Sequence, residues 1–353
     1  MSASDGSADD DATPSSKTMP STGPRRRELS VDDYVRGVRA SDRAILGRAI
    51  SLVESNARAH YELAQSVLTE LLPYTGGAHR VGISGVPGVG KSTFIEALGT
   101  TLTGAGHKVA VLAVDPTSER TKGSILGDKT RMVSLSQDLN AFIRPSPSSG
   151  SLGGVGRKTR ETMLLCEAAG FDVVLVETVG VGQSETMVAE MVDFYLVLML
   201  AGAGDELQGI KRGILELADM IAVNKADSGN ERQAERARLE YEGALHLMHA
   251  GKDGWQVPVV KCSAINRSGL TELWANIERY RSEGRASGSL QERRRTQLLR
   301  WTWQMVEHEL VSTLRNHPEV RRIVPELERQ VHDGELTATL GAQQILEAFG
   351  IKK

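Results

Sequence analysis

The stretch Gly85-Val86-Pro87-Gly88-Val89-Gly90-Lys91-Ser92 fits G-x-x-x-x-G-K-[ST], the pattern of a phosphate-binding loop. It follows residues 80–84, which read as a short buried strand, and it opens residues 92–98, which read as a helix. Glycines let backbone N–H groups turn toward one centre, and the N-terminus of the helix adds positive potential there. The stretch predicts a nucleoside triphosphate site, in which Lys91 reaches the terminal phosphates, Ser92 binds magnesium and the adjoining Thr93 completes the contacts.

The composition is that of an ordinary soluble protein. The 353 residues are 40% hydrophobic and 25% charged, and the net charge of −3 gives no overall field that favours nucleic acid. The longest apolar run, 194–201, suits a buried strand and is too short to cross a membrane. Cys166 and Cys262 lack C-x-x-C spacing, so we expect two core residues in a reducing, cytoplasmic protein rather than a disulfide or a thiolate metal site.

Patterning divides the chain into four parts. Residues 1–29 are rich in Ser, Asp, Thr and Pro, which is typical of a disordered tail. Residues 30–77 carry apolar side chains at helical spacing, starting from an N-cap at Ser30. Residues 78–284 alternate apolar strands with helices, and residues 285–353 form a helical arm rich in Arg, Glu and Leu.

Six apolar runs in the third part read as strands. They cover residues 80–84, 108–115, 172–177, 194–200, 220–224 and 257–263. Consecutive Val, Ile and Leu residues are typical of parallel strands that are buried on both faces. The pattern predicts a P-loop α/β fold with a doubly wound, mostly parallel sheet, whose ligand lies at the carboxyl ends of the strands.

The arm after residue 284 is expected to contain three helices. They cover residues 290–315, 319–332 and 338–349, and a proline follows the first of them. Trp301 and Trp303 are interpreted as packing residues rather than ligand residues. A helical arm joined to a compact domain either covers its own core or forms a contact between two copies.

The second motif is Asn224-Lys225-Ala226-Asp227, which follows an apolar strand and fits N-K-x-D. Asp227 is able to accept two hydrogen bonds from the guanine ring N–H and amino group, a pair of donors that adenine lacks. Asn224 either contacts the base or ties this loop to the phosphate loop, and the stem of Lys225 covers the base. A site built from such polar partners rejects the wrong base strongly, because an unmatched group stays unpaired.

A third segment agrees with guanine recognition. Ser263, Ala264 and Ile265 follow the last predicted strand, in the S-A-x pattern whose backbone N–H reaches the guanine carbonyl oxygen. On its own the pattern also fits any junction between a strand and a loop. In this order after the first two motifs, it favours GTP over ATP.

Acidic residues at other strand ends are candidates for magnesium binding and catalysis. Glu177 ends a strand and is followed three residues later by Gly180, which suits water-mediated magnesium binding and sensing of the γ-phosphate. Asp115 ends the second strand, and Asp128 lies in the loop beyond it. Val181 stands where small GTPases carry the glutamine that orients the attacking water, so we expect slow intrinsic hydrolysis.

Taken together, these segments resemble the MeaB/ArgK/MMAA family of GTPases. The resemblance rests on residues 85–93, 114–116, 123–131, 144–146, 177–185 and 204–211. Its most specific parts are the strings ETVGVGQSE and GDELQGIKRG. It covers nearly everything from residue 30 to the C-terminus, although the N-terminal tail has no counterpart and the arm matches in character more than in motif.

The resemblance implies a chaperone of the adenosylcobalamin-dependent methylmalonyl-CoA mutase. It implies that Asp115, Asp128 and Glu177 surround the magnesium, and that two copies pair through the C-terminal helices. It also implies a mobile segment that couples GTP or GDP binding to the mutase, with Lys211 facing the active site. The residues expected to couple are Asp205, Glu206, Gln208 and Lys211.

Other functions remain open at this point. One is an ATP-dependent kinase linked to transport of basic amino acids, which the N-K-x-D motif argues against. Another is a scaffold that binds GTP without hydrolysing it. The cobalamin-binding pattern D-x-H-x-x-G is absent, so the corrinoid is expected on the partner and not on this chain.

Overall fold

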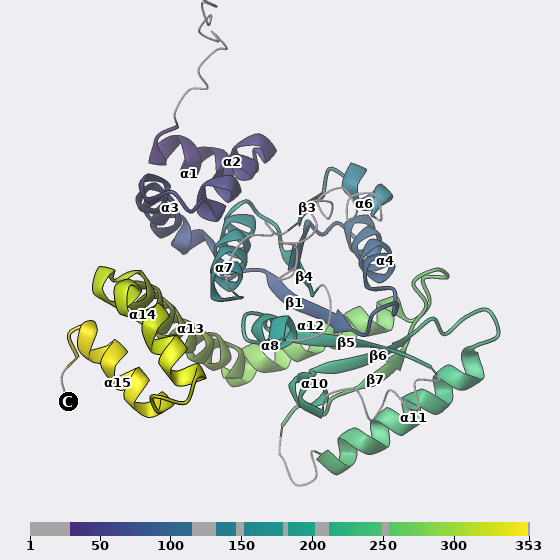
Figure 1. The fold of residues 1–353 in the computed structure, drawn as a ribbon. Helices are drawn as coiled ribbons and strands as arrows, with labels where there is room; N and C mark the ends of the chain where they lie inside the picture. The colour runs from purple at the N-terminus through teal and green to yellow at the C-terminus, as the bar shows by residue number, and fades with distance from the viewer. Residues whose placement is uncertain are drawn as a thin grey trace, which may run out of the picture.

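The computed structural model describes residues 29–114, 132–145, 152–178, 183–201, 212–248 and 254–351. Helices cover both faces of a central sheet, and three C-terminal helices project from one side of it (Figure 1). No helix in these ranges is both long and apolar enough to cross a membrane.

The sheet has seven strands in the order β3-β2-β4-β1-β5-β6-β7, and every described pairing is parallel. The strands are β1 His79–Gly85, β2 Val109–Val114, β3 Ala141–Pro145, β4 Val173–Thr178, β5 Phe194–Leu200, β6 Met220–Asn224 and β7 Val259–Lys261. The doubly wound parallel sheet is therefore confirmed. Because β1 lies between β4 and β5, the phosphate loop stands at the switch point, where such sheets bind ligands.

The edge strand β3 was missed in the sequence. Its residues are Ala-Phe-Ile-Arg-Pro, and only Ala141 is fully buried. An edge strand that pairs with one neighbour tolerates Arg144 and Pro145, so it lacks the continuous apolar run that marks the central strands. At the opposite edge, β7 is shorter than the predicted 257–263, and Cys262 lies buried just beyond its end.

Two hydrophobic clusters fill the two sides of the sheet. In β4, Val174 and Val176 join one cluster, whereas Val173 and Leu175 join the other, as the alternation of side chains in a strand requires. The second cluster lies under α4 Lys91–Gly104, α6 Val133–Gln137 and α12 Leu270–Ser287. The first lies under α1 Val31–Arg39, α2 Arg43–Glu54, α3 Arg58–Leu71, α7 Leu152–Ala168, α8 Gln183–Ala189, α10 Arg212–Leu217 and α11 Glu231–Met248.

The N-terminal helices begin where the sequence predicts. Ser30 caps α1 through a reciprocal pair of hydrogen bonds with Asp33, of 3.1 and 3.2 Å. Three helices and the short 3-10 turn Leu72–Tyr74 follow, and they pack on α7 rather than directly on the strands that carry the nucleotide motifs. Their contribution is to bury one side of α7.

The C-terminal region contains α13 Ser289–Asn316, α14 Pro318–His332 and α15 Ala338–Ala348. These bounds differ by only one residue from those predicted. Trp301 packs under the guanidinium of Arg160, whose central carbon lies 5.1 Å from the ring centre. The prediction of a packing role is wrong for Trp303 within this chain, since that side chain is 67% exposed on the outer half of α13.

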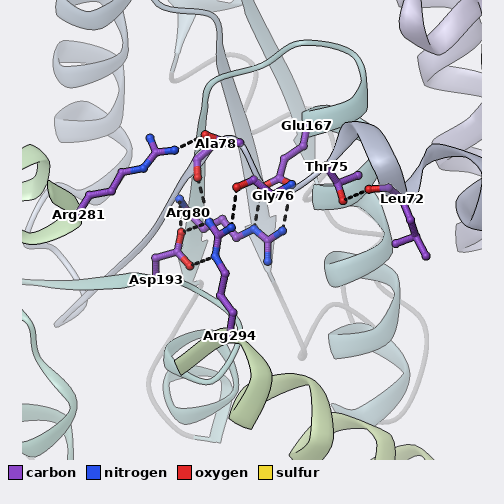
Figure 2. Close-up of polar contacts among 10 residues, drawn as sticks. Leu72, Thr75, Gly76, Ala78, Arg80, Glu167, Asp193, Arg281 and Arg294 are labelled. Atoms are coloured by element: carbon purple, nitrogen blue, oxygen red, sulfur yellow. Dashed lines mark hydrogen bonds and ion pairs between the residues drawn. The ribbon is translucent and has the colours of Figure 1, made fainter. Parts of the chain in front are cut away.

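A buried polar network fastens α13 to the amino ends of the strands (Figure 2). Arg294 donates to both oxygens of Asp193, at 2.7 and 2.6 Å, and to the carbonyl oxygens of Gly76 and Ala78. The neighbouring Arg293 makes the same two-pronged contact with Asp219, at 2.9 Å to each oxygen. These ion pairs attach the first part of α13 to the edge of the sheet where the strands begin. The nucleotide motifs lie at the opposite edge, where the strands end.

Candidate functional site

The phosphate loop connects the end of β1 to the start of α4 through three glycines with positive φ. Gly88 has a φ of 78° and Gly90 a φ of 91°, values that side chains with a Cβ rarely adopt. At Gly85, a Cβ would lie 2.4 Å from the carbonyl oxygen of Leu198 in β5, so any other residue would push the two strands apart. The glycine pattern of the motif is therefore required by the fold as well as by phosphate binding.

Lys91 is folded back over its own loop. Its Nζ donates to the carbonyl oxygen of Gly85 at 2.8 Å. Burial lowers the pKa of Lys91 below that of an ordinary lysine, while the nearby charges of Glu177 and Glu185 act in the opposite direction. The ammonium group is thus a partly desolvated cation held against the backbone carbonyl oxygens of Gly85 and Val86.

Ser92 and Glu177 meet beside the phosphate loop. The Ser92 hydroxyl lies in the first turn of α4 and donates to Glu177 Oε1 at 3.1 Å. Glu177 is the second-last residue of β4 and is only 3% exposed. On the next residue, the Thr178 hydroxyl donates to Ser84 Oγ at 3.0 Å, which ties β4 to β1 below the loop. A hydroxyl and a carboxylate together are hard oxygen donors of the kind that magnesium prefers.

The N-K-x-D segment holds the phosphate loop from the other side. Asn224 Nδ2 donates to the carbonyl oxygen of Val89 at 2.9 Å, and Lys225 Nζ donates to that of Gly88 at 2.8 Å. Asn224 is 1% exposed, so its amide belongs to the core of the site. Of the two roles considered for Asn224, the contact present here is the tie to the phosphate loop.

Asp227 and the Ser263 segment lie together at the neighbouring strand ends. The fully buried Ser263 hydroxyl donates to Asp227 Oδ2 and accepts from the N–H of Asn266 at 3.1 Å. The Ser263 N–H donates to the carbonyl oxygen of Ser268 at 3.0 Å and is therefore already used. An N–H that contacts a guanine carbonyl oxygen would have to come from a later residue of the segment. Ala264 is buried, whereas Ile265 is 75% exposed.

The family model described as "Methylmalonyl Co-A mutase-associated GTPase MeaB" matches residues 46–319 of this chain. The match spans the sheet and all the motifs just described. The chain belongs to the MeaB family. It is a P-loop GTPase.

Individual members of the MeaB family are similar along most of their length. GTPase ArgK of Escherichia coli is 46% identical over 320 residues, covering 91% of this chain and 97% of ArgK. The mitochondrial methylmalonic aciduria type A homolog of Mus musculus is 45% identical over 337 residues, covering 92% and 80%. A crystal structure titled "LAO/AO transport system kinase" superposes with a TM-score of 0.74 at 40% identity, covering 92% and 99%.

Several predicted residues of this MeaB-family site lie outside the described part of the chain. They are Asp115, Asp128, Gly180, Asp205, Glu206, Gln208 and Lys211. The described residues that the fold brings together are the phosphate loop, Glu177 and the guanine-side segments. Within those ranges, one edge of the sheet carries every one of them, as the carboxyl ends of parallel strands require.

Two residues that belong to the site were missed in the sequence. Glu185 is 2% exposed in α8, and after Glu177 its charge is the second that opposes the lowering of the Lys91 pKa by burial. Asn230 donates from its side-chain amide to the carbonyl oxygen of Lys225 at 3.0 Å. The available signals were the position of Glu185 inside the ETVGVGQSE string and of Asn230 directly before a helix.

Proposed function

We propose that this MeaB-family GTPase binds magnesium and GTP, and that its cycle gates cofactor loading into methylmalonyl-CoA mutase and protects that enzyme. The observation that carries the proposal is the match over residues 46–319 to a family described as associated with this mutase. A relative described as a methylmalonic aciduria type A homolog supports it. Adenosylcobalamin belongs to the partner in this proposal, and the protein works in the cytoplasm.

The phosphate loop would perform the chemistry by positioning and charge. Lys91 exchanges its bond to the Gly85 carbonyl for the terminal phosphates, and the N–H groups of residues 88–93 surround them. Water then attacks the γ-phosphorus in line and GDP leaves, while Lys91 stabilises the charge that develops on the transferred group. Gly180 reports whether the γ-phosphate is present. With Val181 next to it, intrinsic hydrolysis is slow until a partner completes the site.

The donor set at Ser92 and Glu177 fits magnesium. A hydroxyl 3.1 Å from a buried carboxylate supplies the hard oxygen atoms that this ion selects. We assign Ser92, Glu177, Asp115 and Asp128 to hold it, directly or through water. When bound, the ion neutralises charge on the phosphate oxygens.

Guanine selection is assigned to the segments beyond the phosphate loop. Asp227 accepts from the base, the Lys225 stem covers it, and the Ala264 and Ile265 region meets its carbonyl oxygen. Support comes from the buried Ser263 hydroxyl, which holds one oxygen of the Asp227 carboxylate and orients the other. This arrangement gives GTP a strong advantage over ATP.

Coupling to the mutase is assigned to Asp205, Glu206, Gln208 and Lys211. A homodimer is assigned to the C-terminal arm, because α13 leaves large apolar side chains in water from its middle to its far end. These are Leu298, Leu299, Trp303, Val306, Leu310 and Val311, with exposures of 41–68%. Exposed apolar groups concentrated on one helix of an otherwise ordinary surface mark an interface.

The nucleotide assignment is tested by calorimetric titration with GTP and ATP. We expect GTP to bind much more tightly, and Asp227→Asn to weaken GTP binding by at least about tenfold, because one lost hydrogen bond to a charged group costs about 1.5–3 kcal/mol. Asp333→Asn removes an exposed carboxylate far from the site and serves as the matched control. Equal affinity for GTP and ATP would refute the assignment.

The partner is tested with purified methylmalonyl-CoA mutase. We expect the mutase to be retained by this protein loaded with a non-hydrolysable GTP analogue, and single-turnover GTP hydrolysis to accelerate when the mutase is added. A scaffold would retain the mutase and leave GTP intact. Absence of both retention and stimulation would contradict the chaperone role while leaving the GTPase assignment intact.

One observation favours a second candidate. The related crystal structure carries a title that names a kinase of an amino-acid transport system. A kinase would need ATP and an acceptor site, whereas the guanine-side contacts of Asn224, Lys225 and Asp227 are those of a GTP site. Transfer of phosphate from ATP to an amino acid or a protein would revive this candidate.

A further inference from the structure

The loop that carries the guanine-side motif contains an uncommon backbone. Lys225 has a φ of 59°, Ser228 a φ of 53° and Gly229 a φ of 90°. Residues other than glycine seldom adopt a left-handed conformation, because the Cβ approaches the following carbonyl oxygen. Such a conformation persists where the surrounding contacts hold it. The loop between β6 and α11 therefore needs an anchor.

Asn230 provides that anchor. Its side-chain Nδ2 donates to the carbonyl oxygen of Lys225 at 3.0 Å, and its backbone N–H donates to that of Asp227 at 2.9 Å. Its own carbonyl oxygen accepts from the N–H of Ala234 at 2.9 Å, which is the first helical bond of α11. One residue thus joins the beginning of the motif, the end of the motif and a long helix.

The two residues that Asn230 holds are those to which the proposed function assigns the guanine base. Lys225 Nζ reaches the carbonyl oxygen of Gly88 in the phosphate loop, so this side chain is fixed at its tip while Asn230 fixes its backbone. Asp227 is fixed at its carboxylate by Ser263 and at its backbone by Asn230. The backbone N–H of Asn230 does not depend on its side chain, so replacing the side chain removes only the bond that holds the Lys225 carbonyl oxygen.

We propose that Asn230 is a positioning residue for guanine recognition, which holds residues 225–229 so that Asp227 meets the base. It acts through Lys225 and Asp227 and does not itself touch the nucleotide. The inference rests on the GTPase activity of the family and is independent of which partner the protein serves.

A purely structural role for Asn230 would be to cap α11. Serine is as good a cap as asparagine, whereas alanine is a poor one. Serine has no side-chain amide, and its hydroxyl is on a shorter side chain, so it does not replace the bond from Asn230 Nδ2 to the carbonyl oxygen of Lys225. Asn230→Ser therefore removes the anchoring bond and keeps a side chain able to cap α11, whereas Asn230→Ala removes the bond and leaves no such side chain.

The experiment measures KM and single-turnover rates with GTP and with inosine triphosphate, which lacks the amino group that Asp227 would bind. We expect both variants to raise KM for GTP about tenfold and to lower the preference for GTP over inosine triphosphate at least about threefold. The rate at saturating GTP should stay within about twofold, because the phosphate loop is unchanged. Asn316→Ser removes the same kind of bond, from Asn316 Nδ2 to Ser312 O, far from the site and should change neither quantity.

Two results would overturn the proposal. One is Asn230→Ser matching the wild type while Asn230→Ala is weakened, which is the behaviour of a helix cap. The other is equal weakening of GTP and inosine triphosphate, which would mean that guanine reading is unaffected. A lower melting temperature of a variant does not alter this reasoning, because the ratio of the two substrates is measured on folded protein only.

Discussion

Replacing Arg294 with methionine should destabilise the whole chain without weakening GTP binding. The Arg294 side chain is 18% exposed and its partner Asp193 is 7% exposed, so the pair is largely removed from water. Arg294→Met keeps the apolar stem and removes four hydrogen bonds, two to Asp193 and two to the carbonyl oxygens of Gly76 and Ala78. The contacts lie at the amino ends of β1 and β5, away from the nucleotide edge.

The expected loss is about 3 kcal/mol in the free energy of unfolding. Breaking a fully buried ion pair costs about 3–5 kcal/mol because one charge is left uncompensated, and the partial exposure of Arg294 places the cost at the lower end. The Asp193 carboxylate retains a bond of 3.3 Å from the Arg80 N–H, which moderates the loss further. Asp193→Leu instead leaves the Arg294 guanidinium without its partner. The double variant, Arg294→Met with Asp193→Leu, should therefore lose less free energy of unfolding than the sum of the two single variants.

Urea denaturation followed by circular dichroism measures this loss, and calorimetry measures GTP affinity in the same samples. The matched control is Arg295→Met on the next residue, whose side chain is 76% exposed and 3.8 Å from Glu292. That variant should stay within about 0.5 kcal/mol of the wild type. The reasoning would be refuted if Arg294→Met and Arg295→Met lowered the free energy of unfolding equally. It would also be refuted if the double variant at Arg294 and Asp193 lost the full sum of the two single losses.

Three further predictions concern the site, pH and assembly. Glu177→Gln should slow magnesium-dependent single-turnover hydrolysis about 10- to 100-fold, because the buried partner of Ser92 loses its charge; an unchanged rate would remove Glu177 from the magnesium site. Burial and the neighbouring Arg281 guanidinium lower the pKa of His79 to about 3, so the folded protein keeps this histidine neutral while the unfolded chain protonates below pH 6.5. Stability is therefore lost as the pH falls through 6.5, by up to about 2 kcal/mol between pH 7.5 and 5.0 in urea denaturation, and His79→Asn should lack this part of the decline. Trp303→Ser should lower the proportion of dimer in light scattering, whereas a monomeric wild type would contradict the assigned interface.

Much of the fold follows from local pattern. The central strands are buried on both faces, so they must be continuously apolar, and the sequence shows them directly. The helices of the arm are equally visible, because they carry apolar residues at helical spacing between clear stop signals. The strand β3 was not predicted, because a strand at the edge of the sheet need not be continuously apolar, and continuous apolar runs are what identified the other strands.

Within the described residues, some parts of the site could be predicted from the sequence and others could not. The phosphate loop and N-K-x-D are readable because each contact needs a particular residue type at a fixed spacing: glycine for positive φ, lysine for charge and aspartate for two acceptors. Glu185 lies in a recognisable string and Asn230 directly before a helix, but neither pattern gives the residue's role, which depends on what the fold brings next to it.

The sequence by itself determined the parallel α/β class, the phosphate loop and the preference for guanine, because these depend on residues that are close neighbours in the chain. Only the tertiary structure decided that Asn224 and Lys225 bind the phosphate loop, that Asn230 holds the backbone of Lys225, and that Arg293 and Arg294 attach the arm to the sheet. These contacts join residues that are far apart in sequence or that share a turn of uncommon backbone. Hydrogen bonds and ion pairs of this kind need two groups at a set distance and angle, and spacing along a chain does not specify where distant groups will meet.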